Sequence, residues 1–261
     1  MGVGLHTFIL LFDGSLCKAK HLQIGSELFD PDRPSTPAVV AEIVFTSEVA
    51  TTLDTPQGSF TVAREPVDNP LPLPVIAFSE THPPPEGMDL FAYGVVLCAE
   101  DGSTRAAFRC LEAEGYVRDG HIQYERFADY EDDLRARQLP HHFARLPPAD
   151  LARLLEGMSQ HAGGRVELTE EDELLVAQLR CACRIARWGF EVRDTYFDIE
   201  TGNLHLQSGK VSSVTMFPDA ASDSLAFTTS PDVEDMVAYV IFQEAGDLRS
   251  VNVQLPYGLA N

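Results

Sequence analysis

The chain has 261 residues, which is enough for one large domain or two small ones with a substantial core. Its net charge of -21 disfavours nucleic acid as a partner, because a phosphate-binding protein normally presents a basic face. No apolar run approaches the roughly 18 residues that span a membrane, and no signal peptide pattern is present. We therefore expect a soluble intracellular protein, in the cytoplasm or the nucleus, with no membrane association.

Residues 1 to about 80 have a β pattern. The apolar run 8–12 meets Asp13-Gly14, a dipeptide typical of tight hairpin turns. Further short strands are predicted in three segments rich in β-branched residues: 39–45, 50–53 and 59–62. Prolines then gather in residues 66–87, and proline continues neither a strand ladder nor a helix interior. We therefore place a domain boundary in that stretch.

The middle of the chain has a mixed helix and strand pattern. Helices are predicted over 89–97, 150–157 and 171–188, where apolar residues recur at helical spacing. A strand pair is predicted around Asp119-Gly120, and later strands at 192–199 and 204–206. From Val211 the pattern is β again to the end. The order β, α/β, β suggests one domain inserted into another.

Several of these segments resemble blocks of a known family. The strand, the Asp13-Gly14 turn, segment 19–26 and the turn at Asp30-Pro31-Asp32 resemble the opening block of inteins and other Hint-fold domains. Residues 227–261 resemble their closing blocks. Segments 91–102 (FAYGVVLCAEDG) and 154–163 (LLEGMSQHAG) look like the two helices of a LAGLIDADG homing endonuclease. The whole chain therefore resembles an intein that carries an inserted endonuclease domain.

The resemblance implies a mixed fold with nested domains. Residues 1–85 and 212–261, the two chain ends, would together form an all-β, Hint-like horseshoe domain. Residues 86–211 would form an interrupting α/β domain of the LAGLIDADG type.

The same resemblance places an endonuclease site at the ends of the two helices. In this family each helix ends in an acid, and the acids hold Mg²⁺, which activates water and stabilises the leaving oxygen. Here Ala162 stands at the acid position of the second copy. In the first copy Asp101 or Glu100 is available as catalytic acid and Asp101 as metal ligand, at a longer spacing from Gly94 than the family has. The alternative for this turn is a solvated loop without a metal.

The splicing positions are also substituted. The nucleophilic Cys or Ser of an intein would align with Gly2, which has no side chain. The histidine of the Thr-x-x-His motif would align with Pro66, and the penultimate histidine with Ala260. Asn261 alone fits the family, where a terminal asparagine cyclises to cut the backbone.

Arginines are concentrated in the middle region. Arg135, Arg137, Arg145 and Arg165 are candidates for a DNA-contacting face. The alternative is pairing with the abundant acids, which the net charge favours. The neighbouring histidines His141 and His142 lie in a predicted loop, and no carboxylate spacing supports a metal site there.

Two functions follow from these patterns. The first is a degenerate, intein-derived protein without activity in splicing or DNA cleavage, kept as a binding or structural module or present as a decayed intein. It would need no cofactor, and its protein partner, if it has one, is unknown. The alternative is a residual Mg²⁺-dependent homing endonuclease that acts on double-stranded DNA through Asp101 or Glu100 and presents a concave sheet lined by arginine.

Overall fold

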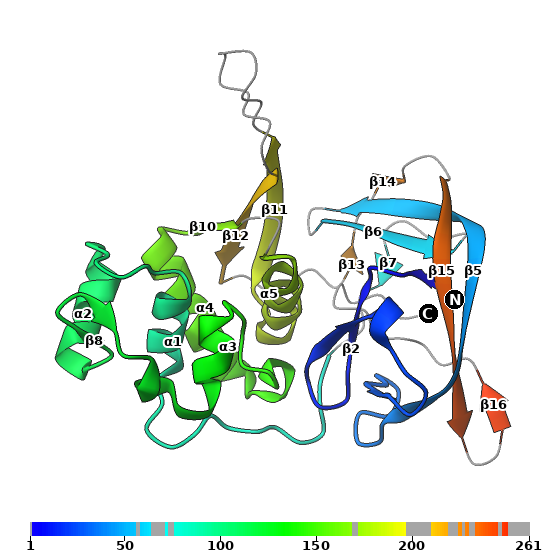
Figure 1. The fold of residues 1–261 in the computed structure, drawn as a ribbon, viewed down its shortest axis with the longest axis horizontal. Coiled ribbons are helices and arrows are strands. Elements are labelled where there is room, and N and C mark those ends of the chain that lie inside the picture. The colour runs from blue at the N-terminus through cyan, green and yellow to red at the C-terminus, as the bar shows by residue number, and fades with distance from the viewer. Residues whose placement is uncertain are drawn as a thin grey trace. The chain divides into compact units, whose positions relative to one another are not determined.

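The chain forms two compact units. The terminal unit consists of Met1–Glu80 and Ser222–Asn261, and the central unit is Thr81–Ala221. The boundaries predicted from the sequence lie after residues 85 and 211. The computed structural model describes residues 2–55, 58–63, 71–72, 76–168, 172–196, 210–218, 224–225, 228–229, 233–244 and 247–249. Figure 1 labels the elements of both units.

The terminal unit is built from antiparallel strands. They are, in chain order, β1 (Gly2–Gly4), β2 (Phe8–Leu10), β3 (Leu16–Lys18), β4 (Glu27–Leu28), β5 (Ala38–Thr55), β6 (Gly58–Ala63), β7 (Leu71–Pro72), β13 (Ser224–Leu225), β14 (Thr228–Thr229), β15 (Val233–Glu244) and β16 (Asp247–Arg249), with one short 3₁₀ turn, η1 (Ala19–His21). The long strand β5 pairs with β15 along one part and with β6 along the other. Because β1 pairs with both β6 and β15, these four strands form a closed ring of pairings.

The predicted hairpin at the start of the chain is present. Strands β2 and β3 pair antiparallel, and the turn between them contains Gly14 at φ 90°. The Asp13 carboxylate accepts hydrogen bonds from the backbone N–H and the hydroxyl of Ser15, at 2.9 and 2.7 Å. This local bonding favours the turn, and it places the side chains of Ile9 and Leu10 in the core of the unit.

The central unit combines helices with one three-stranded sheet. Its elements are α1 (Leu90–Leu97), α2 (Ala106–Glu114), β8 (Val117–Arg118), β9 (His121–Ile122), η2 (Tyr124–Tyr130), α3 (Glu131–Arg135), η3 (Phe143–Arg145), α4 (Pro148–Ala162), β10 (Arg165–Leu168), α5 (Glu173–Ala186), β11 (Gly189–Tyr196) and β12 (Lys210–Phe217). The sheet is antiparallel in the order β10-β12-β11, and β8 and β9 form a separate two-residue hairpin.

Local residues determine where helices α1 and α4 begin and where α4 ends. The Asp89 carboxylate accepts a hydrogen bond from the backbone N–H of Phe91, at 2.9 Å, and so caps the start of α1. Helix α4 begins with Pro148, whose missing N–H costs nothing in the first turn. It ends at Gly163, which adopts a left-handed conformation with φ 70°.

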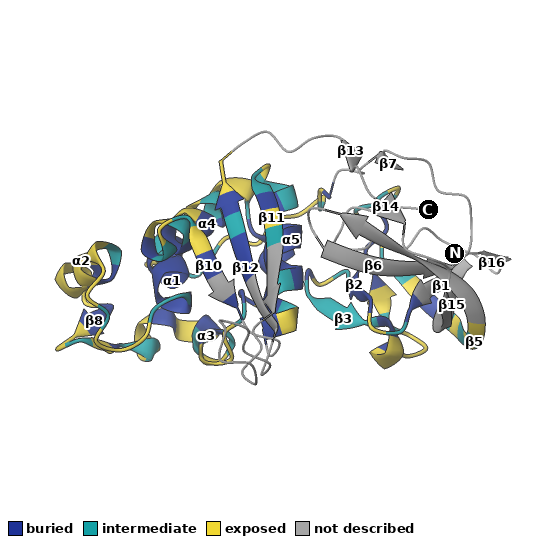
Figure 2. Cartoon of the chain, turned by 90° about the horizontal axis from the view of Figure 1, so that it is seen from above, coloured by how far each residue is buried: buried dark blue, intermediate teal, exposed yellow. Residues whose placement is uncertain are grey.

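The core of the central unit lies around α1. Seven of the eight residues of α1 are buried, so this helix is surrounded by other elements. Figure 2 colours the chain by burial. Helix α4 instead has one buried stripe at the spacing of an amphipathic helix, formed by Leu151, Leu154, Leu155 and Met158. Among the described helices of the chain, none is both long and apolar enough to cross a membrane.

Candidate functional site

Helices α1 and α4 touch backbone to backbone at a pair of glycines. A Cβ atom on Gly94 would lie 2.0 Å from the carbonyl oxygen of Leu154. A Cβ atom on Gly157 would lie 2.1 Å from the carbonyl oxygen of Phe91. Gly94 thus faces the residue three positions before Gly157, and Gly157 faces the residue three positions before Gly94. Only glycine fits at either position, and the contact is the same in both directions.

The two helices run in the same direction, so their C-terminal ends lie together. Near their starts, Arg153 of α4 donates two hydrogen bonds to the Asp89 carboxylate, at 2.9 and 3.1 Å. Beyond their ends, Arg105 donates to the carbonyl oxygen of His161 in the last turn of α4. We call the region around these C-terminal ends the helix-end site. The acids of the sequence-predicted endonuclease site belong here.

Both carboxylate oxygens of Asp101 are used inside the chain. One accepts a hydrogen bond from the backbone N–H of Ile122 at 2.9 Å, and the other lies 3.1 Å from Nδ1 of His121. These contacts, the backbone bond first, lower the pKa of Asp101. The side chain is 53% exposed and fastens the turn after α1 to the β8–β9 hairpin. Glu100, beside it, is exposed.

The end of α4 offers no carboxylate. Ala162 occupies the last position of the helix, and the residue before it is a buried histidine. His161 is 4% exposed, and burial, together with the nearby charge of Arg105, lowers its pKa. Its Nδ1 atom has no hydrogen-bond partner among the described residues. The imidazole is therefore neutral at pH 7 and packs edge-on against the ring of Phe108.

Positive charge occupies the helix-end site. The carbonyl groups at the C-terminal end of a helix carry partial negative charge, which the guanidinium of Arg105 neutralises. A second arginine, Arg137, lies 3.4 Å from the Asp172 carboxylate. Both cations act on the Cys98 thiol just after α1, although burial outweighs them and raises its pKa to about 12. Within the described parts of the chain, no group of three His, Cys, Asp or Glu side chains could hold a metal.

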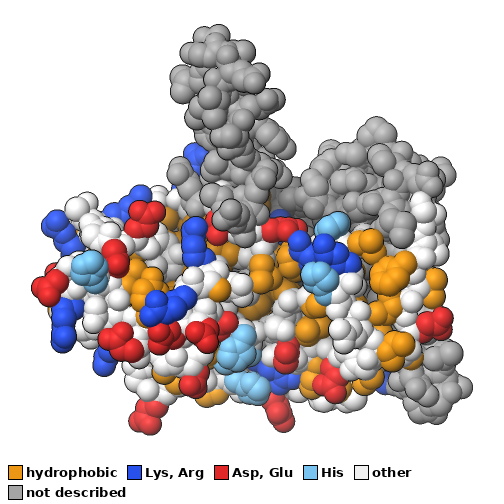
Figure 3. Space-filling view, in the orientation of Figure 1, with side chains coloured by type: hydrophobic (Ala, Val, Ile, Leu, Met, Phe, Trp, Pro, Cys, Tyr) orange, Lys and Arg blue, Asp and Glu red, His pale blue; other side chains and the backbone are white. Residues whose placement is uncertain are grey.

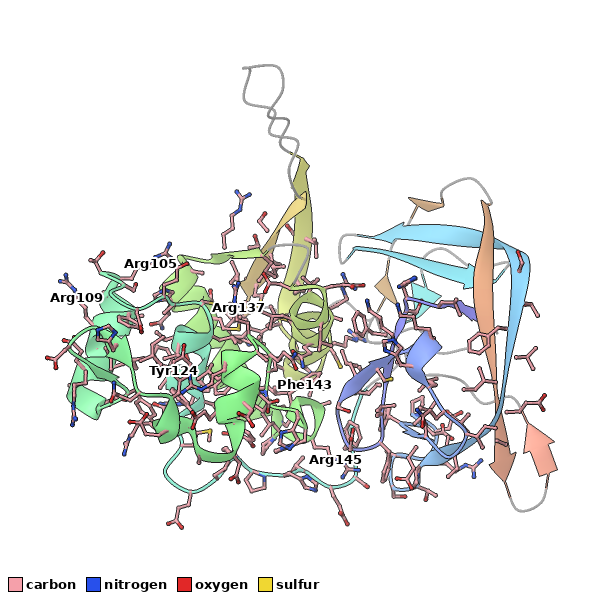
Figure 4. The ribbon with its side chains drawn as sticks, viewed as in Figure 1. Arg105, Arg109, Tyr124, Arg137, Phe143 and Arg145 are labelled. Atoms are coloured by element: carbon pink, nitrogen blue, oxygen red, sulfur yellow. The ribbon has the colours of Figure 1, made fainter. Side chains whose placement is uncertain are left out.

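The four candidate DNA-contacting arginines have different surroundings. Arg135 donates two hydrogen bonds to Glu131, at 2.9 and 2.8 Å, and lies over the ring of Tyr124. Arg137 pairs with Asp172, and Arg145 is only 7% exposed. Arg165 is exposed on β10. Among the arginines labelled in Figure 4, Arg105 precedes α2, Arg137 follows α3 and Arg145 lies on η3.

Strands are distributed unevenly along the central unit. The later half contributes the sheet β10-β12-β11, in which the exposed Arg165 and Glu191 both pair with Thr215. Between α1 and α4 all residues are described, and the strands there are the two-residue β8 and β9. On the face drawn in Figure 3, basic and acidic side chains are interspersed over the coloured part of this unit.

The splicing positions are only partly described. Gly2 lies in β1 and pairs with Tyr239 of β15, and the next residue, Val3, pairs with Val62 of β6. Three positions, Pro66, Ala260 and Asn261, lie outside the described residues.

The sequence reasoning missed Arg105 and His161 at the helix-end site. His161 directly precedes the substituted acid position, which was a usable signal, whereas nothing in the sequence around Arg105 points to a partner 56 residues away. It also missed a chain of hydrogen-bonded side chains that includes His141 and His142. Comparison with known proteins gives no match, either to a family model or to a curated protein.

Proposed function

We propose that the chain is an intein-derived protein that neither splices nor cleaves DNA, and that its fold serves as a binding or structural module. One observation carries this proposal. At the ends of α1 and α4, Ala162 supplies no ligand, Asp101 is bound to His121 and Ile122, and Arg105 contributes a positive charge.

Two features support the family part of the proposal. The closely packed glycines Gly94 and Gly157 are the glycines of the two segments that resemble LAGLIDADG helices. The terminal unit contains both chain ends and the central unit lies between them in sequence, which is the order of parts in an intein with an insertion. The close contact between the backbones of α1 and α4 keeps the helix pair together although the acid at the end of α4 is replaced.

The chemistry supports the loss of cleavage. A metal-dependent nuclease needs carboxylates that are free to bind a divalent cation beside the scissile phosphate. In this chain each oxygen of the Asp101 carboxylate already accepts a contact, from His121 or from the Ile122 N–H, and among the described residues no group of three potential ligands surrounds it. The guanidinium of Arg105 would repel a divalent cation at the same end of the helices. Mg²⁺ therefore has no role in the proposed function.

The surface supports the loss of DNA binding. Arg135 and Arg137 are paired with acids, and Arg145 is buried, so three of the four candidate arginines are committed within the protein or covered. The hairpin β8–β9 has two residues in each strand, whereas the strands of the sheet β10-β12-β11 have four to eight, so the first half of the unit offers no comparable sheet to contact DNA. With a net charge of -21, the chain repels a phosphate backbone at long range. A protein or another chain segment is a better partner for this surface than DNA.

Calorimetric titration of the full chain with Mg²⁺ and with Mn²⁺ tests the proposal without knowledge of a DNA target. We expect no saturable binding heat, and no difference between wild type and Asp101→Ala. The matched control is Glu112→Ala, which removes an exposed carboxylate from α2. Metal binding that Asp101→Ala abolishes and Glu112→Ala preserves would overturn the proposal.

A second experiment addresses splicing. The chain is expressed between two unrelated flanking domains, and the products are separated by mass. We expect only the unspliced fusion, because Gly2 has no nucleophile to attack the preceding carbonyl. Ligated flanking domains would show that splicing survives.

A further inference from the structure

Four polar side chains of the central unit form one continuous hydrogen-bonded chain, which we call the histidine chain. An Asp133 carboxylate oxygen lies 3.0 Å from Nδ1 of His141. Nε2 of His141 lies 3.2 Å from Nδ1 of His142. Nε2 of His142 lies 2.9 Å from the hydroxyl of Tyr130. The backbone N–H of His141 donates to the same oxygen of Asp133, at 2.9 Å.

Counting protons limits what this chain can hold. Consider first the state with Asp133 ionised and both histidines neutral. Nδ1–H of His141 then donates to Asp133, Nδ1–H of His142 donates to Nε2 of His141, and the Tyr130 hydroxyl donates to Nε2 of His142. One added proton reverses the direction beyond His141. The His141 imidazolium then donates from both nitrogens, and His142 donates to the oxygen of Tyr130. All three contacts survive in either state.

A second added proton cannot be accommodated. Both His141 and His142 would then carry hydrogens on every ring nitrogen, so two N–H groups would face each other across 3.2 Å. We propose that the histidine chain is a proton-operated latch, which is closed with no or one added proton and opens when both imidazoles are charged. The protons come from solvent, since the His141 side chain is 61% exposed.

The latch secures the segment that leads into α4. The backbone N–H of Leu139 donates to the side-chain oxygen of Gln178 in α5, at 2.9 Å. The hydroxyl of Tyr93 in α1 donates to the carbonyl oxygen of Gln138, at 2.6 Å. Opening the latch therefore loosens a segment that contacts both α1 and α5. At the far end of this segment, the carbonyl oxygen of Arg145 accepts a hydrogen bond from the backbone N–H of His82, which lies near the start of the central unit.

Charged groups face the latch from η2, α3 and η3. Asp129 and Asp133 face it from η2 and α3, and Glu131 on α3 pairs with Arg135. Burial first, and then these two aspartates, raise the pKa of Tyr130 to about 12, so its hydroxyl stays protonated. From the other side, the His82 ring lies 5.9 Å from the His142 ring, and the cation Arg145 follows on η3.

The latch has a defined effect on stability. Below about pH 6.5 both histidines of the unfolded chain take up a proton, whereas the closed latch holds only one. The unfolded state then binds one more proton than the folded state, so the latch contributes an increase of about tenfold in the unfolding equilibrium constant for each pH unit lost. His161 adds its own acid sensitivity, because burial lowers its pKa. The test is therefore a comparison between variants that share His161.

We would measure urea unfolding of the full chain from pH 7.5 to 5 by the fluorescence of Trp188, its single tryptophan. The glutamine in His142→Gln keeps a hydrogen-bond donor and an acceptor but takes up no proton. We therefore expect the unfolding equilibrium constant of this variant to rise about tenfold less per pH unit lost than that of the wild type. His6→Gln, which removes an exposed histidine of the terminal unit, should keep the wild-type dependence. Equal pH dependence in wild type and His142→Gln would overturn the proposal.

A measurement on the unaltered protein decides the matter should His142→Gln fail to fold. Nitrogen-15 spectra of the imidazoles are recorded through the same pH range. We expect His141 and His142 to titrate as a coupled pair in two steps, with the Tyr130 ring signals shifting in the second. Two independent single-step titrations with an unchanged Tyr130 would refute the latch.

Discussion

Replacement of Gly157 by alanine gives the sharpest test of the packing between α1 and α4. The added Cβ would lie 2.1 Å from the Phe91 carbonyl oxygen, whereas ordinary Cβ contacts begin at 3.4 Å. The helices would have to separate by about 1.3 Å, the difference between those distances. Neither side can yield by rotating a side chain, since the facing atom belongs to the backbone of the neighbouring helix.

The separation has an estimable cost. A gap of 0.5 to 1 Å already forfeits roughly a quarter to a half of the dispersion energy between packed atoms. Overpacking typically costs about 1 to 3 kcal/mol, and a clash between backbones lies at or above the upper end. Alanine recovers up to ~1 kcal/mol through its better helix propensity. We expect Gly157→Ala to lower the free energy of unfolding by about 3 kcal/mol.

Urea unfolding followed by Trp188 fluorescence measures this loss in the right part of the chain. Trp188 follows α5 in the central unit, and its backbone N–H donates to the Cys183 carbonyl at 2.8 Å. With a slope of roughly 2 kcal/mol per molar urea, the midpoint should fall by about 1.5 M. Ser159→Ala in the same helix is the control and should change stability by less than ~0.5 kcal/mol. An unchanged midpoint in Gly157→Ala would refute the close approach of the helices.

Three further predictions use the same unfolding measurement. Asp101→Asn should destabilise by less than ~1 kcal/mol at pH 7, since the group is exposed, and the effect should vanish as pH falls through the lowered pKa of Asp101. Tyr93→Phe should cost about 1 kcal/mol, because the partly buried Gln138 carbonyl loses its donor, and an equal midpoint would contradict the bond. The lowered pKa of His161 makes the folded state bind its proton less readily than the unfolded state, so His161→Phe should flatten the loss of stability below about pH 6.5.

Local features could be predicted from the sequence. The Asp13-Gly14 turn depends on bonds between neighbours, and it is present as expected. The helix expected over 89–97 is observed as α1, and the strand pair around Asp119-Gly120 as β8 and β9. These elements are encoded by capping groups, turn residues and apolar spacing within a few positions of the chain. The predicted strand at 204–206 lies outside the described residues.

Long-range features could not be predicted in this way. Arg105 reaches the carbonyl of His161 across 56 positions, and an exposed-looking arginine before a short helix carries no mark of such a partner. The position of Asp101 in the sequence does not tell whether it is a metal ligand or a turn residue. The hydrogen bond that decides this comes from a hairpin residue 21 positions away. His141 looked like an ordinary loop residue, since its bond to Asp133 depends on how the chain folds back after α3.

The ring of paired strands in the terminal unit gives its first residues unusual importance. Strand β1 spans only Gly2–Gly4, yet it lies between β6 and β15 and completes the ring. Trimming these residues would leave the facing edges of two strands without hydrogen-bond partners. Bare strand edges recruit other chains, so a shortened version of this protein is expected to self-associate into aggregates.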